Sequence, residues 1–176
     1  MVFFTSDTHF CHKLMSDMRG FDSTDEMNER IITTWNVIVG KHDTVYHLGD
    51  FGFKHDSIPH IRHSLNGRIV LVLGNHDLKN RIHNKPLWTC VYELKTISVD
   101  KTPVVLCHYP IRSWDRSHYN SFHLYGHMHN GLNSRDYPVY GKSFDIGWDM
   151  WGRPLEWSEV RAKFAGLPDN PNLINR

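Results

Sequence analysis

Short apolar segments recur along the chain and are separated by longer polar stretches. They are rich in β-branched and aromatic residues and are bounded by Gly, Asp or Asn, a pattern that is typical of buried strands. The segments that we predict as strands are 2–4, 44–48, 69–73, 104–106, 122–125 and 143–146.

Between the first two strands, apolar residues recur with the spacing of a helix. Ser23 and Glu26 have the spacing of a capping box, and Gly40 stands where a glycine commonly ends a helix. The residues on the buried face of this predicted helix are Met27, Ile31 and Trp35.

Two shorter helices are also predicted. The first covers residues 57–65, and its buried stripe consists of Ile58, Ile61 and Leu65. The second covers residues 156–164 and is ended by Gly166.

The order of these elements predicts the fold class. Strands and helices alternate over the first half, which favours an α/β layered domain, whereas 91–106 is typical of a strand pair turned at Asp100-Lys101, so we expect mixed sheets. A chain of 176 residues without an internal repeat or linker is predicted to form one domain, 1–176. Residues 168–176 are rich in Pro and Asn, and we expect a loosely ordered tail there.

Composition narrows the classes of function. The 20 basic and 19 acidic side chains form no long run of one charge, which argues against a nucleic-acid footprint of the usual basic kind. The three cysteines form no CxxC pair, and no segment has the roughly 20 apolar residues that a membrane-spanning helix needs. With no basic leader at the N-terminus, we expect a cytoplasmic protein without a membrane partner.

Histidine is abundant, at 14 residues, and several histidines gather with Asp at the ends of predicted strands. In chain order the clusters are Asp7 with His9, Gly49-Asp50, Gly74-Asn75-His76-Asp77, His108, and Gly126-His127-Met128-His129. Because ligands of α/β sheets gather beyond the carboxyl ends of the strands, we expect these clusters to meet in one crevice.

The chemistry of these clusters suits two divalent metal ions. Imidazole combined with carboxylate and amide oxygen favours borderline metals, and we expect Mn, with Fe, Zn or Ni as alternatives. Two metals about 3.5 to 4 Å apart can clamp a phosphoryl group and activate a bridging water. The sequence therefore predicts a phosphate-ester hydrolase.

The five clusters resemble the pattern of the calcineurin-like metallophosphoesterase family, which reads DxH, GD, GNH[DE], H and GHxH. The chain also resembles small bacterial and phage-type members that open with TSDTHFGH and carry HLGDF, where it reads Thr5 to His12 and His47 to Phe51. One departure is Cys11 in place of a glycine, which would narrow the rim of the pocket without removing a ligand.

The resemblance implies a fold and a set of roles. The fold would be two mixed β-sheets packed as a sandwich flanked by helices. Metal ligands carried over from the family are Asp7, His9 and His129 for the first ion, Asn75, His108 and His127 for the second, and Asp50 as the bridge. A metal-bridging hydroxide would attack phosphorus in line. His76 would contact the substrate phosphate and protonate or stabilise the leaving oxygen, and Asp77 would orient His76.

Two further residues have open interpretations. His12 lies three residues after His9 and suits either substrate contact or a place at the rim of the site. Arg112 lies four residues after His108, where its planar fork suits a phosphate oxygen, but an ordinary surface arginine fits as well.

The substrate class has alternatives too. A small, nucleotide-like phosphate ester fits the near-neutral charge, whereas related folds also include nucleases that act on DNA or RNA. A third hypothesis is a metal-binding scaffold without catalysis. Such proteins have usually lost some of the metal ligands, whereas this sequence has all of them. The choice between monoester and diester, the native metals and the oligomeric state stay open.

Overall fold

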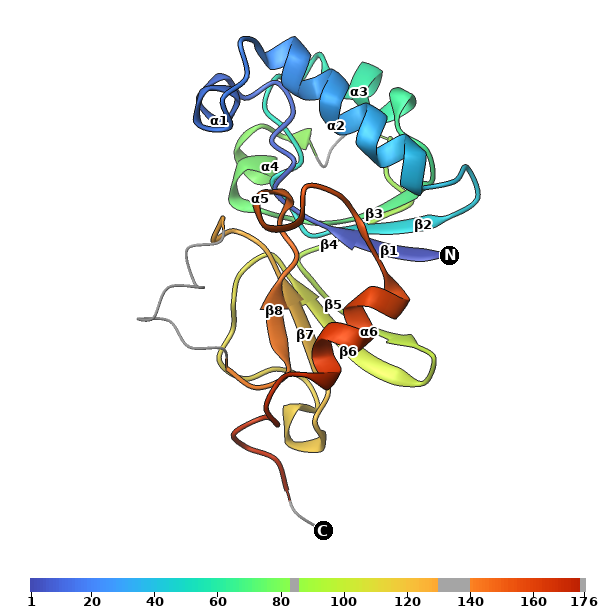
Figure 1. Ribbon diagram of the computed structural model, residues 1–176, viewed down its shortest axis with the longest axis vertical. Coiled ribbons are helices and arrows are strands. Elements are labelled where there is room, and N and C mark those ends of the chain that lie inside the picture. Colours follow the sequence, from blue (N-terminus) through green and yellow to red (C-terminus); the bar gives the residue numbers. More distant parts are fainter. Residues whose placement is uncertain (83–85, 130–139, 175–176) are drawn as a thin grey trace.

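Two β-sheets face one another at the centre of the protein, and helices pack against them (Figure 1). The computed structural model describes residues 1–82, 86–129 and 140–174. The first sheet has the strand order β4-β3-β2-β1-β9, and the second has the order β5-β6-β7-β8.

The first sheet is parallel apart from one edge. Its strands are β1 (Val2–Thr5), β2 (Thr44–His47), β3 (Arg68–Val72), β4 (Cys90–Tyr92) and β9 (Leu155–Glu156). Strands β1 to β4 pair in parallel, and β9 pairs antiparallel with β1. The sheet is therefore mixed, and the carboxyl ends of β1, β2 and β3 lie at the same edge.

The second sheet is mixed as well. Its strands are β5 (Leu94–Val99), β6 (Thr102–Cys107), β7 (Phe122–Tyr125) and β8 (Ser143–Asp145). Strands β6, β7 and β8 are parallel, whereas β5 pairs antiparallel with β6 through the predicted turn. Asp100 and Lys101 in that turn have φ values of 48° and 64°, as a tight hairpin turn requires at both central positions.

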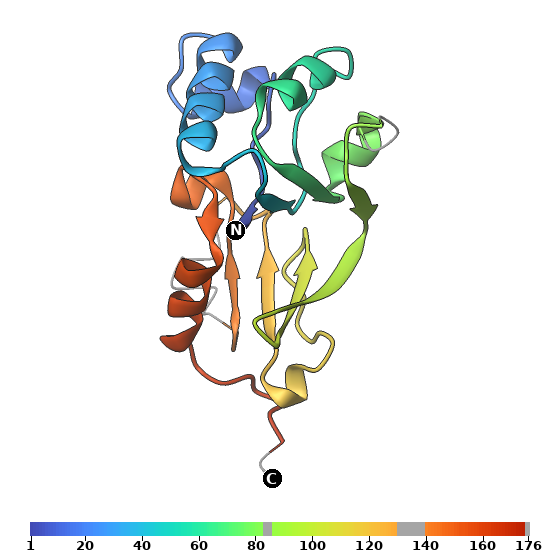
Figure 2. The same ribbon diagram turned by 90° about the vertical axis from the view of Figure 1, so that its right-hand side faces the viewer.

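The alternation of side chains along each strand divides the core in two. Phe3 of β1 packs on the helices α2 (Thr24–Ile38) and α3 (Ile58–Ser64), whereas Phe4 faces the second sheet. The helix α6 (Trp157–Ala165) packs into this second half of the core. Figure 2 shows α6 beside the second sheet and the other long helices above the first. The expected sandwich of two mixed sheets flanked by helices is confirmed.

The ends of helix α2 were predicted with partial success. The hydroxyl of Ser23 accepts a hydrogen bond from the backbone N–H of Glu26, as expected for the cap. Gly40, however, does not end the helix in a left-handed conformation, because Val39 already turns into extended backbone with φ −93° and ψ 122°. Gly40 instead donates its N–H to Asp43 of the following turn.

Several short elements were missed because they carry little periodicity. They are the strands β4 and β9 and the helices α1 (Lys13–Met18), α4 (Asn75–Lys79) and α5 (Trp148–Trp151). Residues 91 and 92 belong to β4 of the first sheet, so the predicted strand pair begins at β5. Within the described residues, no helix has both the length and the apolarity needed to span a membrane.

The expectation of a loose tail over 168–176 is wrong for its described part. Asn170 is 3% exposed, and its side-chain amide donates to the carbonyl oxygens of Ser117 and Ser121. Its own carbonyl oxygen accepts from the backbone N–H of Lys142 at 2.7 Å. These bonds anchor the segment to the end of the second sheet, an interaction that composition cannot reveal. Residues 175 and 176 lie outside the described residues.

Candidate metal centre

The loops that follow five parallel strands converge between the two sheets. The backbone N–H of Asp7 donates to Gly49, and that of His9 donates to Asp50, so the loops after β1 and β2 run side by side. Gly126 donates in the same way to His108, which joins the loops after β6 and β7. The predicted meeting of the five clusters in one crevice is therefore present.

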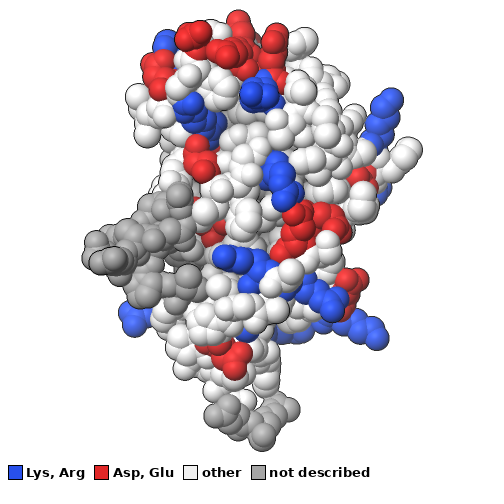
Figure 3. Space-filling model, viewed as in Figure 1, with Lys and Arg blue, Asp and Glu red and all other residues white. Residues whose placement is uncertain are grey.

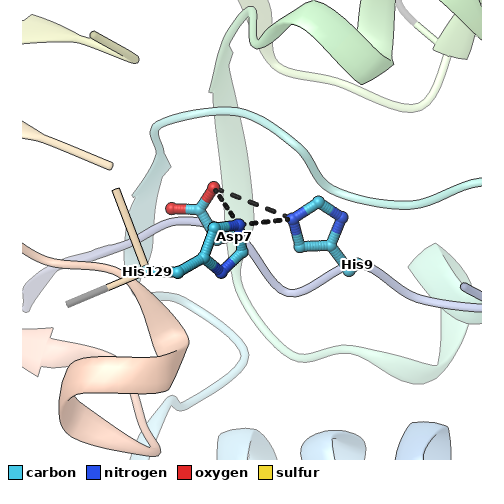
Figure 4. A group of neighbouring side chains, drawn as sticks. All are labelled: Asp7, His9 and His129. Carbon is cyan, nitrogen blue, oxygen red and sulfur yellow. Dashed lines mark hydrogen bonds and ion pairs between the residues drawn. The ribbon is translucent and has the colours of Figure 1, made fainter. Parts of the chain in front are cut away.

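The first group of ligand atoms consists of Asp7, His9 and His129 (Figure 4). The Nε2 atoms of His9 and His129 face one another at 3.3 Å, and Oδ1 of Asp7 lies 3.9 Å from each. Asp7 and His9 are almost completely buried, at 0% and 2% exposure. Three ligand atoms from segments 120 residues apart in sequence thus point at one small space.

The second group consists of Asp50, His108 and His127. Oδ2 of Asp50 lies 3.6 Å from Nε2 of His108, which in turn lies 3.2 Å from Nδ1 of His127. The same Oδ2 is 3.8 Å from Nε2 of His9 in the first group. Asp50 therefore lies between the two groups.

Asn75 adds an amide to the loop after β3, and its Oδ1 atom is buried without a hydrogen-bond partner among the described residues. Oδ1 of Asp7 is also buried and has no hydrogen bond within the same part of the chain. An unpaired buried oxygen costs free energy, and a bound cation would remove that cost. The donor set of carboxylate, imidazole and amide thus fits divalent metal ions.

The backbone at these positions is strained. Asp7, His9, Asp50, His127 and His129 all have positive φ values, between 46° and 71°. Non-glycine residues rarely adopt this left-handed conformation, and they do so mainly where function requires a side chain in an unusual direction. The concentration of these conformations at the candidate ligands supports a functional centre.

Two of the motif glycines make room for carboxylates. A Cβ atom on Gly74 would collide with the carboxylate of Asp50, and one on Gly126 would collide with that of Asp7. These two glycines therefore leave space for the acidic ligands themselves.

Burial dominates the electrostatics of the ligands. It raises the pKa of Asp7 to about 7 and lowers the pKa of His9 well below its usual value. Burial also lowers the pKa of His108, although the nearby carboxylate of Asp50 opposes this shift. Neutral imidazoles with free lone pairs are good metal ligands, and bound cations would stabilise the ionised form of the buried acids.

His129 has an outer partner that sequence reasoning missed. Its Nδ1 atom donates to Oδ2 of Asp149 at 2.5 Å, and Asp149 is held by Arg19 through bonds of 2.7 and 2.9 Å. Arg19 also donates to the backbone carbonyl oxygens of Asp7 and Thr8. The chain Arg19–Asp149–His129 therefore orients the imidazole so that Nε2 faces the first group.

The hydrogen bonds that link Arg19, Asp149 and His129 also shift the pKa values of the last two residues. Burial by itself raises the pKa of Asp149, but the hydrogen bonds from His129 and Arg19 outweigh burial and hold the pKa well below its usual range. The bond to Asp149 raises the pKa of His129 despite burial of the ring. No motif marked Asp149, since it follows His129 by 20 residues and lies among tryptophans.

His76 lies where the sequence predicted, but the expected role of Asp77 is wrong. Nε2 of His76 is 3.7 Å from Oδ2 of Asp50, and its Nδ1 is buried without a hydrogen-bond partner in the described residues. The carboxylate of Asp77 accepts backbone N–H groups of Asp50, Phe51 and Gly74 at 2.8 to 2.9 Å. Asp77 therefore holds two ligand loops together instead of orienting His76.

His12 and Arg112, the two residues with open interpretations, lie at different distances from the centre. The ring of His12 stacks on Phe53 with centroids 3.6 Å apart and lies 5.9 Å from the ring of His76, so it borders the centre. Arg112 is exposed and lies over the ring of Tyr140 at 5.9 Å, which matches an ordinary surface arginine.

Cys11, which replaces the glycine of similar sequences, is 8% exposed. Its φ of 59° explains why glycine suits this position. The backbone N–H of Cys11 donates to Asn28, whose amide donates in turn to Sγ. These contacts hold the cysteine in its left-handed conformation.

The profile of the calcineurin-like phosphoesterase superfamily domain matches residues 1–140 of the chain. The chain belongs to this superfamily. Calcineurin-like phosphoesterases are metal-dependent enzymes, so the protein is a metal-dependent phosphoester hydrolase that acts on a phosphate ester with the help of divalent metal ions.

Relatives of this phosphoesterase occur in phages and archaea. Gene 66 protein of Mycobacterium phage L5 is 27% identical over 192 residues, covering 90% of this chain and 91% of its own. An uncharacterized protein of Methanocaldococcus jannaschii is 38% identical over 81 residues, covering 43% of this chain and 46% of its own.

A solved structure shares the fold. The crystal structure of a protein of unknown function from Aquifex aeolicus superposes with a TM-score of 0.73 at 24% identity, covering 93% of this chain and 98% of that chain. The layered arrangement of the two sheets is therefore common to both proteins.

Proposed function

We propose that the protein is a binuclear phosphoesterase that hydrolyses a small, nucleotide-like phosphomonoester or phosphodiester. The observation that carries this proposal is the position of Asp50, whose Oδ2 atom lies within 3.8 Å of a histidine nitrogen in each group. A carboxylate in this position suits a bridge between two cations because its charge offsets their repulsion.

Each ion would have its own ligand set. The residues proposed for the first ion are Asp7, His9 and His129. The residues proposed for the second ion are Asn75, His108 and His127, with Asp50 shared. When bound, the two ions would polarise the phosphoryl oxygens, lower the pKa of a water molecule and offset developing charge. We propose Mn as the native metal because the ligands mix imidazole with oxygen.

The protein side chains complete the reaction. A water molecule attacks phosphorus in line, and the bond from phosphorus to the ester oxygen breaks on the opposite side. His76 donates a proton from its ring to that departing oxygen, so the alcohol leaves in neutral form. The ring of His76 lies 4.6 Å from that of Phe53, and its backbone N–H donates to Asp50, which together hold it beside the centre.

The support for His76 as the acid is its place beside, but outside, both ligand groups. Its Nε2 atom is 3.7 Å from Oδ2 of Asp50, close enough to reach a phosphate held over that carboxylate. Asp77 acts indirectly in this proposal, because it positions Asp50 through the backbone. His12 would contact the substrate at the border, and we assign Arg112 no role in the reaction.

The test is metal titration combined with turnover. Metal-free protein is loaded with Mn²⁺, Zn²⁺, Ni²⁺, Fe²⁺ or Mg²⁺, and bound metal is counted while hydrolysis of bis(4-nitrophenyl) phosphate and 4-nitrophenyl phosphate is followed. We expect two equivalents of metal per chain at full activity, with Mn²⁺ the best activator. Full activity with a single equivalent, or in the presence of a chelator, contradicts a binuclear mechanism.

The substrate is identified by a screen of the metal-loaded protein. The compounds are cyclic nucleotides, nucleotide monoesters, dinucleotides and oligonucleotides, with Asp50→Asn as the blank. Asp56→Asn is the matched control, because the Asp56 side chain is 99% exposed and lies outside the ligand groups. We expect the highest kcat/KM for a small nucleotide ester. A clear preference for long oligonucleotides would favour a nuclease instead.

A further inference from the structure

A groove of about 890 Å³ opens beside the metal centre. Its walls come from three segments, at the start of α1, in the loop after β2 and at the end of α4. The lining side chains are Cys11, His12, Lys13, Leu14, Phe53, Lys54, His55, Lys79, Asn80 and Arg81. A volume of this size holds a molecule far larger than a single phosphate group.

The groove shares a wall with the border of the centre. His12 and Phe53 line it, and their stacked rings lie 5.3 and 6.1 Å from the ring of His9. Phe53 also lies 4.6 Å from His76, the proposed acid. A substrate whose scissile phosphate lies at the centre would therefore extend past His76 into the groove.

The charge of the groove has one sign. Among the described residues, its lining includes four Lys and Arg side chains and no Asp or Glu. Lys13 pairs with Asp17 on its own helix, but within the described part of the chain Lys54, Lys79 and Arg81 have no ion-pair partner. These three side chains are exposed and free to bind an anion.

The face of the molecule that Figure 3 shows carries mixed charges. The whole chain has a formal net charge of +1, and on the face shown in Figure 3 acidic and basic side chains are interspersed. Acidic groups gather at the top of that view, over the N-terminal end of α2, where the first turn carries Asp25 and Glu26. The cationic lining of the groove is thus a local feature.

We propose that this groove binds a second phosphate group of the substrate, so that the preferred substrates carry at least two phosphates. The proposal rests on the proposed function and names the substrate class of that site. The scissile phosphate would be neutralised by the two metal ions, so Lys54, Lys79 and Arg81 would attract a further anion of the same substrate. Phosphates joined directly and phosphates separated by a nucleoside both meet this chemistry.

The first test compares two dinucleotides that differ only by a 5′-phosphate. In the parent, kcat/KM should favour the 5′-phosphorylated dinucleotide. In the double variant Lys54→Ala/Lys79→Ala that preference should fall about 5- to 20-fold, as expected when two exposed charge contacts are lost. Lys41→Ala is the matched control, because Lys41 is an exposed lysine in the turn before β2, outside the groove.

An unchanged preference in the double variant overturns the proposal, and so does a parent that does not distinguish the two dinucleotides. Circular dichroism and thermal unfolding establish that the variants are folded. Hydrolysis of bis(4-nitrophenyl) phosphate, which has one phosphate, tests the proposed function independently of the groove. If the parent cleaves it but ignores the 5′-phosphate, the groove proposal fails while the proposed function stands.

Equilibrium binding tests the groove without turnover. A fluorescein-labelled, 5′-phosphorylated dinucleotide is titrated with the parent, the double variant and Lys41→Ala. We expect weaker binding only for the double variant. Competition experiments then compare a nucleoside triphosphate, whose phosphates are joined directly, with the unlabelled dinucleotide, whose phosphates are separated by a nucleoside. The stronger competitor identifies the preferred arrangement. If neither competes and all three proteins bind equally, the result contradicts the proposal even if no substrate is cleaved.

Discussion

The two groups of candidate ligands lie side by side but are held in different ways. In the first group, His129 is oriented by charged side chains, because it donates to Asp149 and Asp149 is bound by Arg19. The second is oriented by the backbone, because Nδ1 of His108 donates to the carbonyl of Leu48 at 2.7 Å. Asp77 supplies the remaining support of the second group through backbone N–H groups.

The two groups therefore differ in how far from the ligands, along the sequence, their supporting residues lie. The support of the second group comes from the loops that carry the ligands themselves. The support of His129 in the first group comes from Asp149 of α5 and from Arg19, which directly follows α1 and lies 130 residues away from Asp149 in sequence. The first group should therefore respond to changes far from the motifs, whereas the second should respond to changes within them.

The largest effect is expected at the carboxylate between the groups. Asp50→Asn should reduce kcat by on the order of 10³-fold or more and weaken both metal equivalents, because the amide removes the shared negative charge. Asp7→Asn should weaken mainly the first equivalent. Stepwise metal titration with both variants checks this, and an Asp50→Asn protein that loses only one equivalent would show that Asp50 belongs to a single group.

The next effect is expected at His76, outside both groups. His76→Gln should lower kcat by about 10²- to 10⁴-fold while two equivalents of metal still bind, because only the proton donor is lost. The deficit should be smaller for 4-nitrophenyl esters, whose leaving group needs little protonation, than for alkyl esters. His60→Gln, on the exposed face of α3, is the control. Loss of metal by His76→Gln identifies it as a ligand.

The outer support of the first group should have a moderate effect. Asp149→Asn should weaken the first metal equivalent by about 10- to 100-fold, since it no longer accepts the proton of His129 with a full charge. The second equivalent should keep its affinity. Competition with a chelator measures both constants, and equal weakening of the two sites would remove the distinction between them.

Asp77→Asn tests the support of the second group. One amide oxygen cannot accept all three backbone N–H groups, so we expect a loss of about 1 to 3 kcal/mol in the free energy of unfolding. The metal affinity of the second group should fall with it, because Asp50 loses a backbone bond. Urea unfolding of the metal-free protein measures the stability, and a stability equal to that of the parent would refute this role.

The smallest expected effect is on stability at acidic pH. His123, in the strand that leads to His127, donates from Nδ1 to Val105 and accepts at Nε2 from Ile111. Burial lowers its pKa from 6.5 to about 4, whereas the unfolded chain binds a proton near 6.5. At this histidine the unfolded state therefore binds more protons, and the contribution of His123 to the free energy of unfolding should fall as the pH drops from about 6.5 to 4.

Thermal unfolding of the metal-free protein between pH 7.5 and 4.5 measures this loss, with His123→Gln as the comparison. The variant should be less stable at pH 7.5 but less sensitive to acid. Asp149, which supports the first group, should not contribute to this loss. Its low pKa keeps the carboxylate charged over this pH range. An identical pH dependence in parent and variant would exclude His123 as the source.

Much of the fold and the candidate centre could be predicted because the signals are local. The strand that ends at Thr5 and the capping box at Ser23 depend on neighbouring residues. The five clusters were found because each directly follows an apolar strand. The parallel order of the strands then brings their ends together without further information.

Other features could not be predicted, for reasons that differ. Asp149 lies in a short helix of four residues with no periodic pattern, and its partner Arg19 stands in an ordinary polar segment. Asp77 was assigned to His76 because the two are neighbours in sequence. In the folded chain its carboxylate is surrounded by backbone N–H groups, which sequence patterns do not describe.

The sequence by itself determined the class of chemistry, because ligand identity and strand-end position are properties of short segments. Only the tertiary structure decided how the ligands are divided, that Asp50 lies between the groups, and which charges support each one. It also decided that cations from three separate segments line one groove. These features depend on distances across the molecule, and such distances are set by the packing of the two sheets.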